Sequence, residues 1–301
     1  MTTVLLFVGV VFIWGSTWLA VKFQVGNVPP EASVAYRMGI AAIFMFGWVL
    51  VRRLPLKFSL HAHLYMVLQG ALIFSTNFFL FYHAAAYMTT GLIAVVFSTA
   101  SAMTLLVNAI LMRRSPSVRV LLGAALGVLG ISIVFWPELA RFSLASSAGL
   151  GVILSFGGTL CFSLGSIVSA RNRKAGLSVS GNTAWAMLYG TALLICFLFF
   201  SGKHFVFDAR AAYVVSLMYL SIIGSVVAFA AYFALLGRID AERAAYATVL
   251  FPIVALTLST FFEDYHWTGI AVTGVLLTLT GNVLVLKQPR VSAAANGPKR
   301  G

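Results

Sequence analysis

The stretch FIWGSTWLAVK, residues 12–22, places a Gly-Ser-Thr triplet between two tryptophans inside an otherwise apolar run. The two tryptophans are four residues apart, so both lie on one face of a helix. Gly15 and Ser16 recur as Gly165 and Ser166, about 150 residues later, inside a second apolar run. An apolar stretch that returns half a chain later with the same small residues indicates a duplicated helical framework.

The composition is that of an integral membrane protein. Of the 301 residues, 61% are hydrophobic and 9% are charged, and the mean hydropathy is +0.99. A soluble domain carries about 25% charged residues, and this chain has too few polar side chains to cover a globule. Its apolar runs are continuous and reach the roughly 20 residues that cross a bilayer as a helix. We therefore expect an all-α membrane protein.

Charged residues, prolines and glycines divide the chain into ten apolar spans. The spans fall near residues 3–24, 31–51, 63–83, 89–112, 118–136, 149–169, 180–201, 211–236, 244–262 and 267–286. Five spans form each half, and we expect the halves at residues 1–140 and 148–288, followed by a disordered cytoplasmic tail at 291–301. Because five is odd, the second half enters the membrane from the opposite side, and the repeat is inverted.

A single shift of about 150 residues aligns further positions of the two halves. The aligned pairs are Phe78 and Phe229, Phe81 and Tyr232, Gly123 and Gly274, and Gly130 and Gly281. Small residues allow helices to approach closely. The recurrence of Gly15 as Gly165 therefore predicts that the first and sixth spans cross each other at these glycines.

Lys and Arg residues are distributed unevenly between the two sets of connections. If the N-terminus is cytoplasmic, fifteen of the 20 lie on that side and four on the other, with Arg37 inside a span. This bias predicts that both termini lie in the cytoplasm and that the chain is a multi-pass protein of the bacterial inner membrane. Because topology accounts for the placement, the net charge of +13 does not indicate a nucleic-acid partner.

The sequence does not contain the residue patterns that several kinds of catalysis and ion coupling require. All seven acidic residues fall at span ends or in connections, which disfavours an intramembrane aspartyl protease and a carboxylate proton relay. The chain has no G-x-x-x-x-G-K-S/T motif, no H-E-x-x-H motif and no cluster of Cys and His. We expect no enzymatic activity, no catalytic residue, no cofactor and no metal site.

Aromatic and polar side chains inside the spans are the candidates for a substrate site, because they can point into the bundle. The candidate substrate-binding residues are Trp14, Ser16, Arg37, Asn77, Phe78, Tyr82, Phe97, Ser98, Trp185, Phe229, Tyr232 and Tyr246. Helix packing remains the alternative for each of them. Arg37 either extends to the outer interface, pairs with Glu31 or contacts a substrate carboxylate, and Asn77 bonds either to another helix or to substrate.

Four stretches of the sequence resemble motifs of the drug/metabolite transporter superfamily, in particular those of its ten-helix EamA-type members. The resemblance is carried by WGSTW (residues 14–18), SLGSIV (163–168), LLGAALGVLGI (121–131) and AVTGVLLTLTGNVL (271–284). It implies two inverted five-helix halves with a central cavity between spans 1–4 and 6–9. Within the superfamily, the chain is most similar to bacterial exporters of aromatic amino acids.

The residues and the resemblance together predict a secondary transporter. It would export aromatic or hydrophobic amino acids, or similar small metabolites, by alternating access. Without a central carboxylate, facilitated efflux is favoured over proton antiport. The expected partners are a small-molecule substrate and the lipid bilayer, and the sequence is compatible with a monomer. A proton-driven multidrug or metabolite exporter, an importer, and a membrane-embedded enzyme or receptor remain alternatives.

Overall fold

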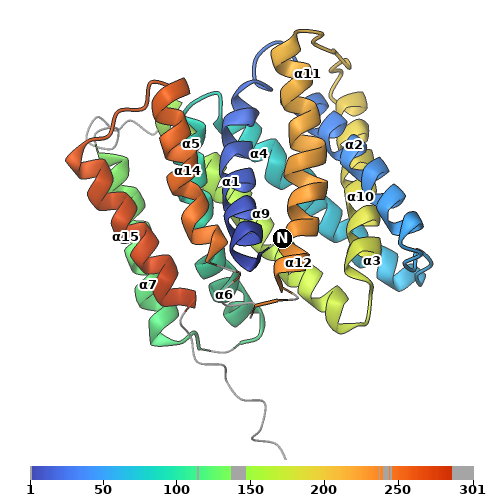
Figure 1. Ribbon diagram of the computed structural model, residues 1–301, viewed down its shortest axis with the longest axis horizontal. Coiled ribbons are helices and arrows are strands. Elements are labelled where there is room, and N and C mark those ends of the chain that lie inside the picture. Colours follow the sequence, from blue (N-terminus) through green and yellow to red (C-terminus); the bar gives the residue numbers. More distant parts are fainter. Residues whose placement is uncertain are drawn as a thin grey trace, which may run out of the picture.

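The computed structural model describes residues 2–113, 115–136, 147–236, 238–239, 244 and 246–286, and its regular elements there are helices. They stand side by side as one bundle (Figure 1). In chain order the elements are α1 (Thr3–Lys22), α2 (Pro30–Val51), α3 (Leu60–Gln69), η1 (Gly70–Thr76), α4 (Asn77–Ala84), α5 (Thr90–Ser98), α6 (Ala100–Leu111), α7 (Val118–Val134), α9 (Ser147–Lys174), α10 (Val179–Phe200), α11 (Ala211–Met218), η2 (Tyr219–Val227), α12 (Ala228–Leu236), α14 (Ala247–Phe262) and α15 (Gly269–Leu286). The tail predicted at 291–301 lies outside the described residues.

The predicted all-α membrane architecture is confirmed. In the described part of the chain, seven helical runs are long and apolar enough to cross a membrane, and the α5–α6 pair, bent by 40°, makes an eighth. The apolar helices α7 and α14 are shorter, with 17 and 16 residues. All of these helices lie within the expected spans or extend them by a few residues, but the count of ten membrane crossings stays a prediction.

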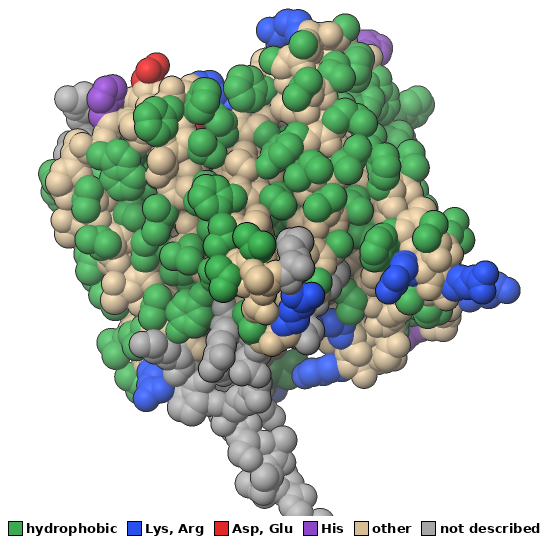
Figure 2. All heavy atoms as spheres, viewed as in Figure 1, with side chains coloured by type: hydrophobic (Ala, Val, Ile, Leu, Met, Phe, Trp, Pro, Cys, Tyr) green, Lys and Arg blue, Asp and Glu red, His purple; other side chains and the backbone are tan. Residues whose placement is uncertain are grey.

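The outer surface of the bundle is apolar. Figure 2 shows hydrophobic side chains over most of the visible face and Lys and Arg side chains mainly along its lower edge. Val51, Phe199 and Phe200 are each at least 80% exposed. Lipid solvates such side chains, whereas water does not. We call the lower end of the bundle in Figure 1, where α6 ends and α7 begins and from which α1 runs upward, the N-face, and the other end the opposite face.

The two halves end their helices in the same way. Among the described residues, the backbones with left-handed φ form three pairs about 150 residues apart: Gly26 and Gly176, Arg53 and Gly202, and Arg113 and Asp264. They follow α1 and α9, α2 and α10, and α6 and α14. A left-handed residue is a common way to end a helix. Its recurrence at three equivalent ends indicates that the two halves share one fold.

Both halves also contain a π-helical segment, η1 in the third span and η2 in the eighth. The N–H of Asn77 donates to the Leu72 carbonyl, and the N–H of Ala228 donates to the Ile223 carbonyl, each five residues back. The sequence predicted continuous helices here, because a turn widened by one residue leaves an apolar run unchanged. Such segments are frequent at functional sites.

Helices α7 and α15 pack through reciprocal glycines. A Cβ atom on Gly123 would lie 2.6 Å from the carbonyl oxygen of Gly281, and one on Gly274 would lie 2.5 Å from that of Gly130. Since Gly123 is equivalent to Gly274 and Gly130 to Gly281, each contact is the image of the other under a two-fold axis. This is the relation that an inverted repeat requires.

The predicted crossing of the first and sixth spans at their shared glycines is wrong. A Cβ on Gly15 would lie 2.6 Å from Val254 Cβ in α14, whereas one on Gly165 would lie 3.1 Å from Leu72 Cβ in η1. Each glycine therefore allows close packing against the other half of the chain, but against a different helix. The recurrence of the glycine indicated that another helix approaches closely at each position, but it could not identify which helix.

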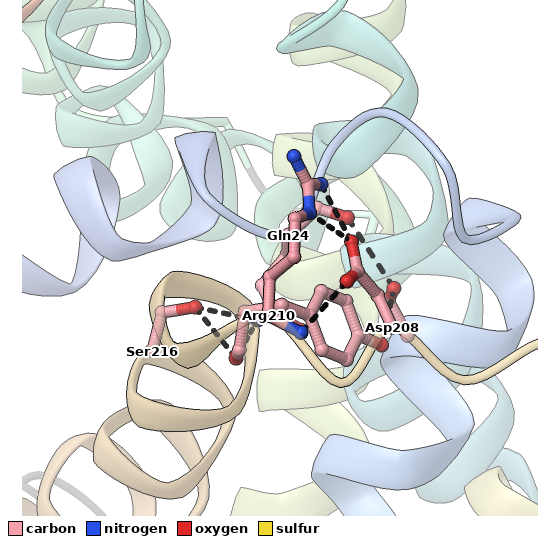
Figure 3. Close-up of polar contacts among 6 residues, drawn as sticks. Gln24, Asp208, Arg210 and Ser216 are labelled. Atoms are coloured by element: carbon pink, nitrogen blue, oxygen red, sulfur yellow. Dashed lines mark hydrogen bonds and ion pairs between the residues drawn. The ribbon is translucent and has the colours of Figure 1, made fainter.

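Buried amide groups fasten the helices at both ends of the bundle. Toward the N-face, Asn172 Nδ2 donates to Gln69 Oε1 at 3.1 Å and to Asn182 Oδ1 at 3.0 Å, which joins α9, α3 and α10. At the opposite face, Gln24 Nε2 donates to Ser216 Oγ at 2.6 Å, which joins the end of α1 to α11 (Figure 3). Because buried amides require partners, these bonds fix how the helices meet.

Candidate substrate site

Trp14 lies in the middle of α1 and faces the second half of the chain. Its ring centroid is 5.0 Å from that of Tyr232 and 6.0 Å from that of Phe229, both in α12. These separations are typical of interacting aromatic rings. The structure thus brings three of the predicted site residues together, and we call Trp14, Phe229 and Tyr232 the Trp14 group.

A second aromatic group surrounds Trp18, one turn further along α1. The Trp18 ring lies 5.2 Å from Phe81, 5.5 Å from Phe97 and 6.3 Å from Phe251, measured between centroids. Phe97 in turn lies 4.8 Å from Phe162. We call these five residues the Trp18 cluster. It combines α1, α4 and α5 of the first half with α9 and α14 of the second.

Sequence reasoning found only part of the Trp18 cluster. Phe97 was a predicted site residue, and the spacing of Trp18 four residues after Trp14 placed both on one helix face. Phe162 and Phe251 were missed. Each is one phenylalanine in an apolar helix, and nothing in the sequence distinguishes it from a side chain that faces lipid.

A hydrogen bond from the other side of α1 also joins the two halves. The hydroxyl oxygens of Ser16 in α1 and Tyr219 at the start of η2 lie 2.7 Å apart. The Ser16 hydroxyl also donates to the Phe12 carbonyl at 2.6 Å, which leaves Tyr219 as the donor to Ser16. Ser16 was a predicted site residue, whereas Tyr219 was not.

Arg37 points into the bundle. Its side chain is 4% exposed, its guanidinium carbon lies 4.3 Å from the centroid of the Phe78 ring, and the Tyr82 hydroxyl lies beside it. Burial excludes extension to the outer interface, and Glu31 forms its ion pair with Lys203, at 2.7 Å. Three predicted site residues therefore meet here, and we call Arg37, Phe78 and Tyr82 the Arg37 group.

The three groups belong to one continuous region. Phe78, Phe162 and Tyr219 all pack against the same buried core, which includes Tyr82. Phe162 is also part of the Trp18 cluster, and Trp14 packs against the buried core that contains Trp18, Phe81 and Phe251. Arg37 is thus the cationic edge of an aromatic region between the two halves, the position at which inverted-repeat transporters bind substrate.

Two predicted polar site residues are engaged in helix contacts. Asn77 Nδ2 donates to the Gly158 carbonyl at 2.8 Å, which joins α4 to α9. The Ser98 hydroxyl donates to the Val95 carbonyl at 2.7 Å and accepts from Asn282 Nδ2 at 3.0 Å. In this structure both side chains serve the contact between helices, the alternative that the sequence had left open.

Two aromatic candidates lie apart from these groups. Trp185 Nε1 donates to the Leu56 carbonyl at 3.0 Å, and the indole stacks on Tyr189 at 5.7 Å. Tyr246 immediately precedes α14 and is half-buried. Within the described residues, neither Trp185 nor Tyr246 has a ring contact with the Trp14 group or the Trp18 cluster.

Helices α1, α5 and α14 are fastened to one another at the opposite face. The Glu263 carboxylate accepts from the Thr90 N–H at 3.0 Å and from the Thr90 hydroxyl at 2.7 Å, which joins α14 to α5. Lys22 Nζ donates to the Phe262 carbonyl, which joins α1 to α14. These bonds lie between the aromatic region and the opposite face.

Toward the N-face, the packing around the site changes. After the 40° bend at Thr99, α6 packs mainly against α9 and α7, whereas α5 packs against α14, α9 and α1. Of the twelve residues of α6, only Ala100 and Ala102 are buried. Helix α6 is therefore less enclosed by the described helices than α5 is.

Comparison with known proteins identifies the family. The model of the EamA-like transporter family matches residues 1–136 and again residues 149–287. A probable amino-acid metabolite efflux pump of Escherichia coli (strain K12) is 24% identical over 282 residues, 90% of each chain. Protein PagO of Salmonella typhimurium is 22% identical over 264 residues, 87% of this chain and 85% of PagO.

A solved crystal structure with 16% sequence identity has a TM-score of 0.67, over 94% of this chain and 95% of the other. At this identity the likeness concerns the fold alone. The two family matches cover nearly the whole chain and coincide with its two structural halves. The chain therefore belongs to the EamA-like transporter family.

Proposed function

We propose that this transporter exports aromatic or hydrophobic amino acids, or similar small metabolites, by alternating access. The observation that carries the proposal is the aromatic region between the halves, formed by the Trp14 group and the Trp18 cluster. Aromatic faces bind apolar and aromatic groups. The relative described as a probable amino-acid metabolite efflux pump supports the same substrate class.

The distribution of charge supports an orientation with both termini in the cytoplasm of a bacterial inner membrane. Arg52, Arg113, Arg171 and Lys174 follow helices that end at the N-face or lie at such ends, and Lys and Arg side chains gather along that edge in Figure 2. By the positive-inside rule, the N-face is then cytoplasmic. In this orientation, substrate would enter from the cytoplasm at the N-face.

The carboxylates support facilitated transport without proton coupling. Glu31 is paired with Lys203 and Asp208 with Arg210, and Glu263 accepts from Thr90. All three acidic residues lie toward the opposite face, and within the described residues none joins the Trp14 group or the Trp18 cluster. A proton-coupled carrier usually places a carboxylate in its substrate path.

The test is uptake into proteoliposomes that contain only this protein. We expect saturable uptake of labelled phenylalanine and tryptophan without a pH gradient, and no comparable uptake of glycine or a quaternary ammonium ion. Trp14→Ala should weaken the apparent affinity for tryptophan by about tenfold, because an aromatic pair contributes roughly 0.5–1.5 kcal/mol beyond the area it buries.

The matched control is Trp48→Ala. Trp48 lies on the surface of the bundle and is 43% exposed, so its removal should leave uptake unchanged. Uptake of the quaternary ammonium ion alone would overturn the proposal and would favour a multidrug carrier. Uptake of phenylalanine only under an imposed pH gradient would overturn facilitated transport.

A further inference from the structure

Arg37 is a buried cation without an acidic partner in the described part of the chain. The ion pairs there are Glu31 with Lys203 and Asp208 with Arg210, and the His83 ring lies 3.5 Å from the Glu31 carboxylate. Arg37 is the eighth residue of α2, about 10 Å along the helix at 1.5 Å per residue. A guanidinium is always charged in proteins and is costly to bury alone.

Two polar atoms of the Arg37 group have unused hydrogen-bonding capacity. Arg37 Nε and the Tyr82 hydroxyl are both fully buried, and neither forms a hydrogen bond of normal geometry within the described residues. The Tyr82 side chain has 0% exposure. Buried polar atoms usually have partners, so an unpaired donor on each of two neighbouring side chains indicates a missing acceptor.

The Phe78 ring compensates only part of the charge. A cation over an aromatic face gains some stabilisation, but the ring supplies no acceptor for the N–H groups. A carboxylate would supply both the negative charge and the acceptors, and its two oxygens match the planar guanidinium. Phe78 would then lie against the apolar body of the same ligand.

We propose that the Arg37 group binds the carboxylate of the substrate, and that the transporter accepts aromatic monocarboxylates whether or not they carry an α-ammonium group. The inference rests on the proposed function and narrows its substrate class. A monoanion neutralises Arg37, whereas a zwitterion adds a second cation. Within the described residues, no acidic side chain contacts the Arg37 group to hold that ammonium.

The test separates the two ends of an amino acid. N-acetylphenylalanine and 3-phenyllactate keep the carboxylate and lack the ammonium, whereas phenylalaninamide keeps the amine and lacks the carboxylate. Binding to purified protein is measured as the shift in thermal unfolding midpoint, and competition as inhibition of labelled phenylalanine uptake. We expect both acids to bind within about threefold of phenylalanine and the amide to bind at least about tenfold more weakly.

Arg37→Met should abolish the midpoint shift that both acids produce. Without ligand, this variant should be at least as thermally stable as the wild type, because it removes an unpaired buried charge. Tyr82→Phe should weaken acid binding by about fivefold, the loss of one hydrogen bond. The control is Arg52→Met, which removes an exposed guanidinium that lies 5.5 Å from the centroid of the Trp48 ring.

The outcomes distinguish the two proposals. If phenylalanine is transported and the amide competes as well as the acids, the carboxylate inference fails and the proposed function stands. If no amino acid is transported but the acids bind through Arg37, the inference stands and the proposed function fails. Acid binding that survives Arg37→Met, together with a large loss of stability, would overturn the inference and make Arg37 a structural residue.

Discussion

The hydroxyl groups of Ser16 and Tyr219 lie 2.7 Å apart and connect the two halves of the chain. Ser16 belongs to α1, the helix that carries both tryptophans, and Tyr219 begins η2. The bond therefore joins the helix that lines the aromatic region to a segment with widened turns. Alternating access requires the two halves to move against each other, so the bond is expected to contribute to the stability of this conformation.

We expect Ser16→Ala and Tyr219→Phe each to lower the free energy of unfolding by about 1 kcal/mol, the contribution of one hydrogen bond. The double variant should lose little more than the larger single loss, because both changes remove the same bond. Denaturant unfolding of the three variants in detergent measures these values. Fully additive losses would show that the two hydroxyls do not interact.

Gly123→Ala should prevent normal folding, because its Cβ would lie 2.6 Å from the Gly281 carbonyl oxygen and 2.5 Å from Val285. The main-chain oxygen cannot move without separating α7 from α15. The matched control is Gly47→Ala in α2, where no atom lies within 4 Å of the new Cβ. Gel filtration in detergent should show aggregation of the first variant only, and equal behaviour of both would contradict the packing.

Glu263→Gln should loosen the contact between α14 and α5 at the opposite face, because an amide accepts more weakly than a carboxylate from the Thr90 N–H and hydroxyl. A cysteine placed at Ala94, which is fully buried against the Trp18 cluster, reports on access from that face. With the two native cysteines removed, we expect faster labelling by a membrane-impermeant maleimide.

The control for this change is Asp264→Asn. Asp264 is exposed and has a φ of 54°, a conformation that asparagine tolerates well. It should leave the labelling of the cysteine at position 94 unchanged. If both variants label at the wild-type rate, Glu263 does not hold the opposite face closed.

The sequence predicted the helices well because a bilayer imposes a simple rule, namely an apolar run of sufficient length. It also related the halves correctly at Gly123 and Gly274, since close helix contacts restrict a position to glycine. Neither rule predicts which other helix a given residue packs against. The partners of Gly15 and Gly165 were therefore predicted wrongly, and the bend at Thr99, which has no proline or glycine beside it, was not foreseen.

For the site, the sequence identifies residues that are unusual in a membrane span. It does not show which side chains they contact. Trp14 and Arg37 were noticed for this reason, and the structure shows what they contact. Asn77 was equally unusual, yet its Nδ2 donates a hydrogen bond to the Gly158 carbonyl of another helix. Phe162 carried no signal, because a single phenylalanine in an apolar helix can face lipid as well as a site.

The loop before α11 should respond to acid. Hydrogen bonds from Arg210 lower the pKa of the Asp208 carboxyl below its ordinary value of 3.8, and Figure 3 shows the two side chains facing each other, with Arg210 Nε 2.7 Å from Asp208 Oδ2. Because the folded pKa is depressed, the stabilisation is present above the ordinary value and is lost as the pH falls through the lowered one.

Pepsin cleavage of the segment 201–210 measures this effect. Relative to Asp208→Asn, the wild type should be cleaved more slowly at pH values above the ordinary carboxyl pKa, and the two rates should converge as the pH falls below it. A ratio that stays constant across this range would show that the ion pair does not stabilise the loop.

We propose that the protein carries aromatic amino acids between its two halves by alternating access, without proton coupling. A counterflow experiment can decide whether it does. Proteoliposomes are loaded with unlabelled phenylalanine, diluted into a trace of labelled phenylalanine at equal pH on both sides, and sampled over time. We expect a transient accumulation of label above its equilibrium level, and a smaller one in Trp14→Ala. Absence of this overshoot, with uptake that appears only under a pH gradient, would contradict it.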